Sequence, residues 1–377
     1  MLRPDPELHQ DPKLDYTIQD PNLPFADYIK KCKALIENSR QDLSTNADII
    51  IEANSPYELQ PKTTHPKHGV LLIHGLFDCP FLVKDIGRML QKQGCLVRSV
   101  LLPGHGTIPG ALLSVHYQDW LQTVRYGAAS FAGLTDKVSL VGYSTGGSLA
   151  AYYAAQDPNI TNIILLSPAI KIDSCFDFLS GTLSEVGRYW PRAGWMRITD
   201  EIDYARYQSI AYNPIYQVHQ LANAIKKSDI AKKIQCPVYI AACEDDKIVS
   251  TKNSIAFFQQ TSNPKNQMLI YSNHAHEIQD SRIHFRNCRY PEWGIDNFSH
   301  LTLPISPDNP HYGKNGDYVY ASHIDKTKFN YSAQNQLDEK WSELLYQFNF
   351  SSVRSRRLTF NPDFERMADE ISQFIFS

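Results

Sequence analysis

The segment VGYSTGGSLA, residues 141–150, has the residue types and the spacing of a serine nucleophile. Gly142, Ser144 and Gly146 match the pattern G-x-S-x-G, which places a serine at a sharp turn between a strand and a helix. Glycine has no Cβ, so the strand and the helix can approach closely. We expect the Ser144 hydroxyl to project from a strained backbone at a helix N-terminus, which favours developing negative charge. The alternative is a glycine-rich turn whose serine only caps the helix.

A serine hydroxyl is a weak nucleophile, so it needs a base to take its proton and an acid to orient that base. With this motif the expected chain order is serine, then aspartate or glutamate, then histidine. The segment PVYIAACEDDKIVS, residues 237–250, ends a predicted buried strand in Glu244, Asp245 and Asp246. We favour Asp246 as the acid because it falls in the loop at the carboxyl end of the strand. Glu244 and Asp245 are its rivals, and solvated loop charges are the structural alternative.

The base is harder to choose from the residues. The chain after the next predicted strand, in NQMLIYSNHAHE, offers four candidates for the base: His274, His276, His300 and His311. The first two have the spacing of a metal-binding pair, but no third ligand stands at a fixed distance from them. A single loop histidine is more often a surface residue than a catalytic base, so the residues alone leave the assignment open.

The elements that must position these residues alternate regularly from residue 69 onward. Buried strands are expected in five apolar segments: GVLLIHG, CLVRSVLLPGHG, KVSLVGYS, NIILLSP and CPVYIAACEDD. Helical patterns lie between them, and NPDFERMADEISQFIF predicts a closing helix at residues 361–376. Alternation of this kind predicts an α/β protein with a mostly parallel sheet and helices on both faces.

Two regions fall outside this alternation. Before it, we expect an irregular arm over residues 1–24, an amphipathic helix over 25–38, a strand at ADIIIEA (47–53) and a loop at NSPYELQPKTTHPKH (54–68). Within it, residues 171–230 show no strand pattern and predict short helices. Nine aromatic residues lie between positions 176 and 216, a higher density than the chain's 11%. We expect a lid with an aromatic underside; a subdomain whose aromatics pack on one another is the alternative.

The composition restricts the partners. Lys and Arg (37) nearly balance Asp and Glu (40), and no basic stretch has the density of a nucleic-acid-binding surface. The longest apolar runs are too short to span a bilayer. The chain opens with acids and prolines, so no secretory signal is visible. Seven cysteines without a CxxC pair favour a reducing compartment, and we expect a cytoplasmic protein.

Four segments resemble the successive motifs of the α/β-hydrolase superfamily: LLIHGLFDCP, LLPGHGTIPG, LVGYSTGGSLA and CEDDKIVS. The similarity is greatest to lidded bacterial carboxylesterases and monoacylglycerol lipase-like enzymes, and it covers residues 69–275. It implies the α/β-hydrolase fold with an inserted helical lid. The expected divisions are an N-terminal arm, helix and strand (1–66), the first core part (67–170), the lid (171–230) and the second core part (231–377), which carries a loop insertion at 272–360.

The resemblance also implies the site residues. Asp246 and Val249 match the acid pattern of the family, in which Cys243 replaces a glycine. The family histidine often follows a serine after the last strand, which favours His300 as the base, with His276 second. A long loop separates His300 from that strand, which departs from the family pattern.

By the same matching, the backbone amides of Leu76 and Thr145 would form the oxyanion hole. His74 and His105 would shape loops instead of catalysing. The implied activity is hydrolysis of carboxylic esters through an acyl-enzyme by a carboxylesterase or lipase, on apolar acyl esters such as monoacylglycerols. No metal or organic cofactor is expected.

The same triad also serves amidases, peptidases, thioesterases and acyltransferases, because fold and triad do not fix the leaving group. A different class is a hydrolase-fold protein that binds a ligand without turnover, which would lack a nucleophile, acid or base. The expected partner is a small ester or lipid, with contact to a lipid surface left open and no nucleic acid.

Overall fold

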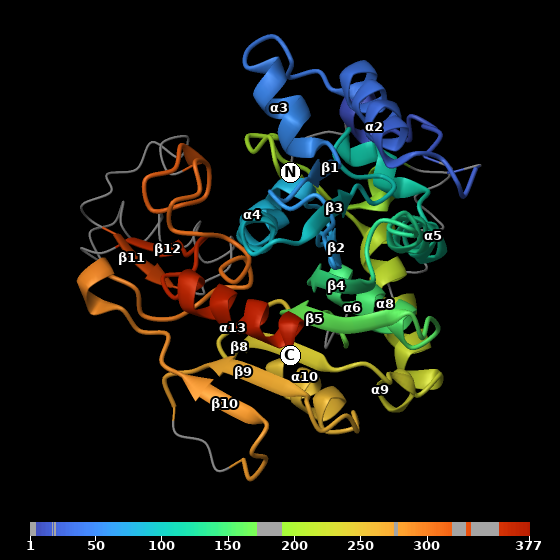
Figure 1. Ribbon diagram of the computed structural model, residues 1–377. Helices are drawn as coiled ribbons and strands as arrows, with labels where there is room; N and C mark the ends of the chain where they lie inside the picture. Colours follow the sequence, from blue (N-terminus) through green and yellow to red (C-terminus); the bar gives the residue numbers. More distant parts are fainter. Residues whose placement is uncertain are drawn as a thin grey trace.

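The computed structural model describes residues 5–16, 18, 20–171, 191–274, 278–318, 329–332 and 354–377. An eight-stranded sheet crosses this part of the chain in the order β1-β3-β2-β4-β5-β8-β9-β10 (Figure 1). Its strands are β1 (Tyr57–Leu59), β2 (His68–Ile73), β3 (Leu96–Val100), β4 (Lys137–Tyr143), β5 (Ile160–Leu166), β8 (Val238–Cys243), β9 (Gln267–Tyr271) and β10 (Ile283–Arg286). All neighbours pair in parallel except β1, which is antiparallel to β3.

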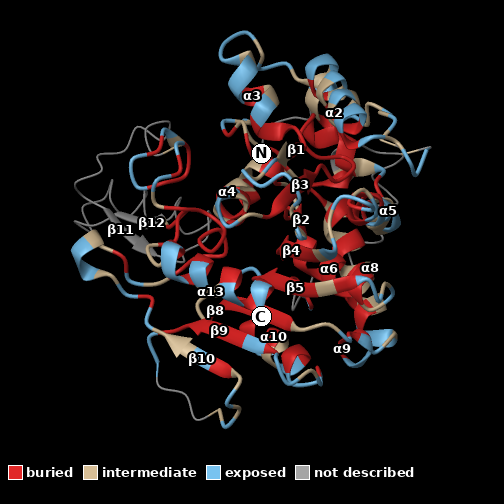
Figure 2. Cartoon of the chain, viewed as in Figure 1, coloured by how far each residue is buried: buried red, intermediate tan, exposed pale blue. Residues whose placement is uncertain are grey.

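Helices cover both faces of the sheet, as the alternation predicted. On one side lie α4 (Lys84–Lys92) and α13 (Phe364–Phe376). The other side carries α5 (Tyr117–Ala129), α6 (Thr145–Ala154), α8 (Tyr212–Lys227), α9 (Ile230–Lys233) and α10 (Thr251–Phe258). Figure 2 shows the buried residues concentrated in the sheet between these layers.

Strand β2 shows why the sheet is buried on both faces. Val70 and Leu72 belong to the core cluster beneath α4 and α13, whereas Leu71 and Ile73 belong to the cluster beneath α5 and α6. Successive side chains of a strand point to opposite faces, so a continuous apolar run fits a strand covered twice. The prediction of an α/β fold with a mostly parallel sheet is confirmed.

The N-terminal region departs from the prediction in two places. Helix α2 (Phe25–Ser39) is present as expected, but the predicted strand at 47–53 is the helix α3, Ala47–Asn54. The β-branched run at its centre favours a strand locally, yet Ile50 and Ala53, three residues apart, form one buried helical face while Ile49 is 56% exposed. Packing of Ile50 and Ala53 in the core therefore outweighs the local strand propensity of residues 47–53.

The predicted loop at 54–68 contains the short edge strand β1. Its three residues, set between prolines, are too few to show a period, so only pairing with β3 identifies them as a strand.

The expected lid region is only partly described. Residues 172–190 lie outside the described part, and with them four of the aromatic residues on which the lid prediction rested. After them come η3 (Pro191–Gly194), an antiparallel pair of β6 (Trp195–Arg197) and β7 (Ile210–Ala211), and the 16-residue helix α8. The expectation of short helices without strands is thus wrong for residues 195–227. Trp195 packs edge-on against His9 of the N-terminal helix α1, Pro6–His9, with ring centroids 4.9 Å apart.

The 272–360 region contains more structure than a loop. It adds β10 to the sheet edge, the 3-10 turn η4 (Pro291–Trp293), and a parallel pair of β11 (Phe329–Ser332) and β12 (Arg354–Arg357). Its central part is tied to helix α4, because Asp85 accepts hydrogen bonds from the Ser306 amide at 3.0 Å and the Asn309 side chain at 2.7 Å.

The tight packing around the nucleophile motif gives a stability prediction. A Cβ at Gly146 would lie 2.2 Å from the carbonyl oxygen of Ile73, so Gly146→Ala should lower the free energy of unfolding by about 1–3 kcal/mol or more, because backbone must move. Urea unfolding measures this loss. Ser148→Ala is the control in the same helix, since the buried Ser148 hydroxyl makes no hydrogen bond among the described residues, and it should leave stability nearly unchanged. Equal stability of Gly146→Ala and wild type would contradict the packing argument.

Candidate active site

Ser144 lies at the tip of a sharp turn between β4 and α6. Its backbone has φ 54° and ψ −116°, a conformation that costs a non-glycine residue energy. Close packing enforces it: a Cβ at Gly142 would lie 2.2 Å from the carbonyl oxygen of Gly146. The Ser144 amide also donates to the carbonyl of Leu166 at 2.9 Å, which ties the turn to β5. The strained turn expected from the motif is therefore present.

Three residues far apart in the sequence form a chain of hydrogen bonds above this turn. His300 Nε2 lies 2.9 Å from Ser144 Oγ, and His300 Nδ1 lies 2.6 Å from Asp246 Oδ2. Ser144 and His300 are 7% and 5% exposed, so the contacts are shielded from bulk water. With Nδ1–H donated to the carboxylate, Nε2 is free to accept the serine proton.

The surroundings of Asp246 keep it ionised. Burial alone would raise the pKa of this carboxyl, but the neighbouring His300 and the backbone amides of Ile248 and Val249 lower it overall. Glu244 accepts a hydrogen bond from Ser272. Since both ring nitrogens of His300 are occupied by Ser144 and Asp246, neither rival carboxylate can take this place.

The other candidate histidines lie elsewhere. His274 is exposed at the end of β9, and its amide donates to the Ser272 hydroxyl. His276 lies outside the described residues. His311 is buried but bonded to Asp203 and Asp317. The structure thus brings His300 to Ser144, and it places His274 and His311 away from it.

His74 and His105 lie buried behind the loop that follows β2, with ring centroids 4.9 Å apart. Burial lowers the pKa of both, that of His105 to about 4, so both rings are neutral. His74 Nε2 accepts from the Leu102 amide at 3.0 Å, and its Nδ1–H donates to the Gly75 carbonyl at 2.8 Å. The Gly75 carbonyl and the Leu76 N–H belong to the same trans peptide group, in which they point in opposite directions. Because the carbonyl points toward His74, the Leu76 N–H points away from it.

The second expected oxyanion donor, the amide of Thr145, belongs to the first residue of α6, directly after the nucleophile. A helix N-terminus has free N–H groups and a positive dipole end, which suits an anion.

Two hydrogen bonds that the sequence did not predict hold His300 in place. The Tyr143 ring lies 5.3 Å from the His300 ring, and its hydroxyl donates to the His300 carbonyl at 3.1 Å. The Ser299 hydroxyl donates to the carbonyl of Leu358 at 2.5 Å, which joins the residue before His300 to the segment before α13. Neither hydrogen bond could be predicted from the sequence, because each joins residues more than 50 positions apart.

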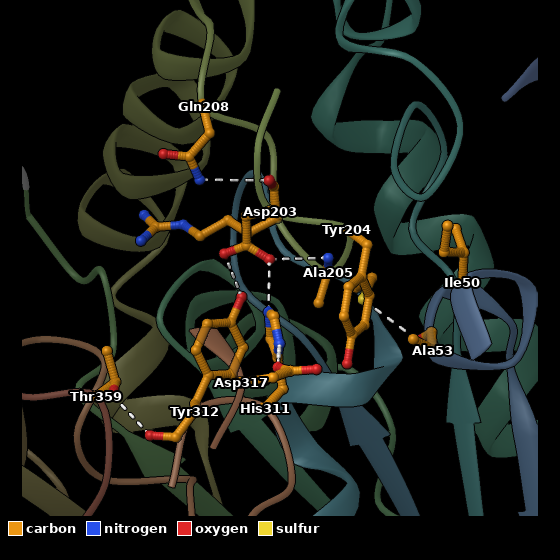
Figure 3. Close-up of polar contacts among 12 residues, drawn as sticks. Ile50, Ala53, Asp203, Tyr204, Ala205, Gln208, His311, Tyr312, Asp317 and Thr359 are labelled. Carbon is orange, nitrogen blue, oxygen red and sulfur yellow. Dashed lines mark hydrogen bonds and ion pairs between the residues drawn. The ribbon is translucent and has the colours of Figure 1, made fainter. Parts of the chain in front are cut away.

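A second polar cluster, with His311 and Asp203 buried at its centre, lies between the segment that precedes β7 and the insertion (Figure 3). His311 contacts carboxylates at both ring nitrogens: Nε2 lies 3.1 Å from Asp203, and Nδ1 contacts Asp317. Asp203 also accepts from the Tyr312 hydroxyl at 2.6 Å and the Ala205 amide at 2.9 Å. Burial lowers the pKa of His311, but the two carboxylates outweigh it and raise the pKa overall, so the charged imidazolium is favoured.

A parallel sheet covered on both faces, with a serine at a strained strand-to-helix turn and an Asp–His pair above it, defines the α/β-hydrolase class. The chain belongs to the family described as serine aminopeptidase, S33 (Hydrolase_4), which matches residues 64–281. The match ends before His300, so the assignment of the base rests on the geometry.

Two known proteins illustrate the similarity. The thermostable monoacylglycerol lipase of Bacillus sp. strain H-257 is 25% identical over 208 residues, 55% of this chain and 82% of that protein. A solved structure from work on the metagenome-derived lipolytic enzymes LipS and LipT covers 59% of this chain and 88% of its own, with a TM-score of 0.50 and 18% identity. The structural likeness supports the fold.

Within the described ranges, no helix has both the length and the apolar character needed to cross a bilayer.

The His311 cluster predicts a pH-dependent stability. The pKa of His311 is raised in the folded state, so the charged ring stabilises the fold. This stabilisation is complete below the ordinary pKa of 6.5 and is lost as pH rises through the raised pKa. His311→Gln should cost about 2 kcal/mol of unfolding free energy near pH 6, since hydrogen bonds to charged groups are lost, and less at pH 9.

Urea unfolding of wild type and variant across this pH range measures the difference, with the exposed His274→Gln as the control that should show none. A difference that stays constant or grows with pH would contradict the assignment.

Proposed function

We propose that the protein is a serine hydrolase that cleaves carboxylic esters through an acyl-enzyme, with Ser144 as nucleophile, His300 as base and Asp246 as orienting acid. The observation that carries this proposal is the continuous hydrogen-bond chain from Ser144 Oγ through His300 to Asp246. A non-catalytic hydrolase-fold protein would have no reason to keep an aligned Ser–His–Asp chain above a strained turn.

In the first half-reaction His300 Nε2 takes the proton of Ser144 as Oγ attacks the ester carbonyl. Asp246 stabilises the imidazolium through Nδ1–H and keeps the ring oriented. The tetrahedral oxygen would accept from the amides of Leu76 and Thr145. The imidazolium then protonates the leaving alcohol, and an acyl group remains on Ser144.

In the second half-reaction a water molecule replaces the alcohol. His300 removes its proton as the water oxygen attacks the acyl carbonyl, and the proton passes to Ser144 Oγ as the acid is released. Each oxyanion donor is worth about 3–4 kcal/mol in such reactions, so the two amides would supply a large part of the rate enhancement.

We further propose an apolar acyl ester as substrate, with monoacylglycerols as the leading candidates. The similarity to a lipase named for monoacylglycerol supports this class. Peptide or amide hydrolysis is the second candidate, because the family description is serine aminopeptidase. Contact with a lipid surface and a cytoplasmic location remain predictions from the sequence.

Substitution of the triad tests the mechanism. Ser144→Ala should lower kcat on a nitrophenyl ester by about 10⁴-fold or more and abolish labelling by a fluorophosphonate probe, because the probe bonds to the activated serine oxygen. His300→Ala should have a comparable effect on kcat, and the exposed His274→Ala should have none. Labelling that persists in Ser144→Ala would remove this serine from the mechanism.

The substrate class is tested separately with purified wild-type enzyme. Nitrophenyl esters of increasing acyl length, together with monoacylglycerols and aminoacyl nitroanilides, should give the highest kcat/KM on medium or long acyl esters, since each buried methylene adds about 0.8 kcal/mol. A higher kcat/KM on the anilides than on every ester would identify a peptidase instead.

A further inference from the structure

The loop that carries the expected Leu76 donor, here called the oxyanion loop (residues 75–79), has a conformation that it cannot hold alone. Phe77 has φ 64°, in the left-handed region that a bulky residue seldom adopts. Such a conformation persists only where the surroundings determine it. The contacts of this loop therefore decide where the Leu76 amide lies.

Two of these contacts come from one short segment, residues 203–207, which we call the strap. The Tyr207 amide donates to the Phe77 carbonyl at 2.9 Å. One residue earlier, Arg206 Nε lies 3.1 Å from Asp78 Oδ1, a buried charge contact that is not aligned as a hydrogen bond. Adjacent strap residues therefore hold adjacent residues of the oxyanion loop.

The strap is itself fixed at both ends. Asp203 accepts from His311 and Tyr312 of the insertion, as Figure 3 shows. At the other end, the Tyr207 hydroxyl accepts from the Thr107 amide at 2.8 Å and donates to the Gly104 carbonyl at 3.2 Å. The strap thus connects the oxyanion loop to the insertion that carries His300.

The carboxylate of Asp78 lies against Gly75, the residue directly before the proposed Leu76 donor. A Cβ built on Gly75 would stand 2.5 Å from Asp78 Oδ2 and 3.1 Å from the ring of Tyr143, so the carboxylate packs directly on the backbone before Leu76. The same Tyr143 ring packs against His300. Asp78 is 3% exposed and the Arg206 side chain 19%, so their attraction is only weakly screened by water.

We propose that Asp78 and Arg206 are positioning residues for the oxyanion hole: their ion pair holds the oxyanion loop so that the Leu76 amide faces the tetrahedral oxygen. This proposal rests on the proposed function, because it assigns the pair a part in ester hydrolysis. Neither residue is proposed to touch the substrate. Both are proposed to act through the backbone of the oxyanion loop. A displacement of about 1 Å in such a donor costs up to 10²-fold in rate.

The alternative is that the pair only stabilises the fold. Removing one partner leaves a lone buried charge and costs stability, so a single substitution cannot separate the two explanations. The double variant Asp78→Asn/Arg206→Gln removes both charges and avoids that penalty. The matched control is Glu58→Gln/Arg98→Gln, which removes a partly buried ion pair between β1 and β3, strands that carry none of the proposed site residues.

The experiment measures kcat, KM and the melting temperature of both double variants on a nitrophenyl ester, and their inhibition by an arylboronic acid. Boron forms a tetrahedral adduct with the serine oxygen, so its affinity reports the oxyanion hole. For Asp78→Asn/Arg206→Gln we expect a fall in kcat of about tenfold or more, KM within threefold, and boronate affinity reduced by the same factor as kcat. The control variant should keep kcat within twofold of wild type.

If the folded Asp78→Asn/Arg206→Gln variant keeps wild-type kcat and boronate affinity, the pair is structural and the proposal is wrong. The single variant Arg206→Lys, which retains the charge, gives a second test and should restore part of kcat relative to Arg206→Gln. Failure of the proposed function would look different, because wild-type protein itself would then hydrolyse no ester and its Ser144 would not react with a fluorophosphonate.

Discussion

The close approach of helix α6 to strands β2 and β4 is the constraint on which the site depends. Gly142 and Gly146 place backbone atoms where any side chain would collide with the neighbouring chain. This packing holds Ser144 at a positive φ, and the hydrogen bond from its amide to Leu166 fixes the turn to the next strand. The proposed nucleophile is therefore positioned by backbone contacts in the centre of the molecule, which do not depend on a bound substrate.

The proposed base, His300, is positioned in the opposite way, from an insertion at the edge of the fold. Residues on long connections are usually mobile, so a base there needs anchors. Asp85 holds the insertion to α4, Tyr143 holds the His300 backbone to β4, and Ser299 holds it to the segment before α13. These contacts from three elements give His300 the fixed geometry that Ser144 has from its turn.

Three buried aspartates, Asp78, Asp85 and Asp246, show how neighbouring groups change the pKa of a carboxyl. Burial raises the pKa of Asp78 to about 6 even beside Arg206, and it raises that of Asp85, which is bonded only to neutral donors. For Asp246 the His300 ring and two amides outweigh burial and lower the pKa. The direction of each pKa shift thus follows from the balance between burial, which favours the neutral acid, and the donors and charges nearby, which favour the anion.

Local sequence patterns were enough to predict the parallel sheet, the helices on both faces and the turn at Ser144. These patterns are apolar runs, helical periodicity and glycines at fixed spacing. The sequence also indicated Asp246 from its place at a strand end. Three features could be seen only in the tertiary structure: the approach of His300 and not His274 to Ser144, the helix at Ala47–Asn54, and the contacts of Asp78, Asp85 and Arg206. Each of these depends on packing or charge between segments distant along the chain, and such interactions leave no periodic trace in the sequence.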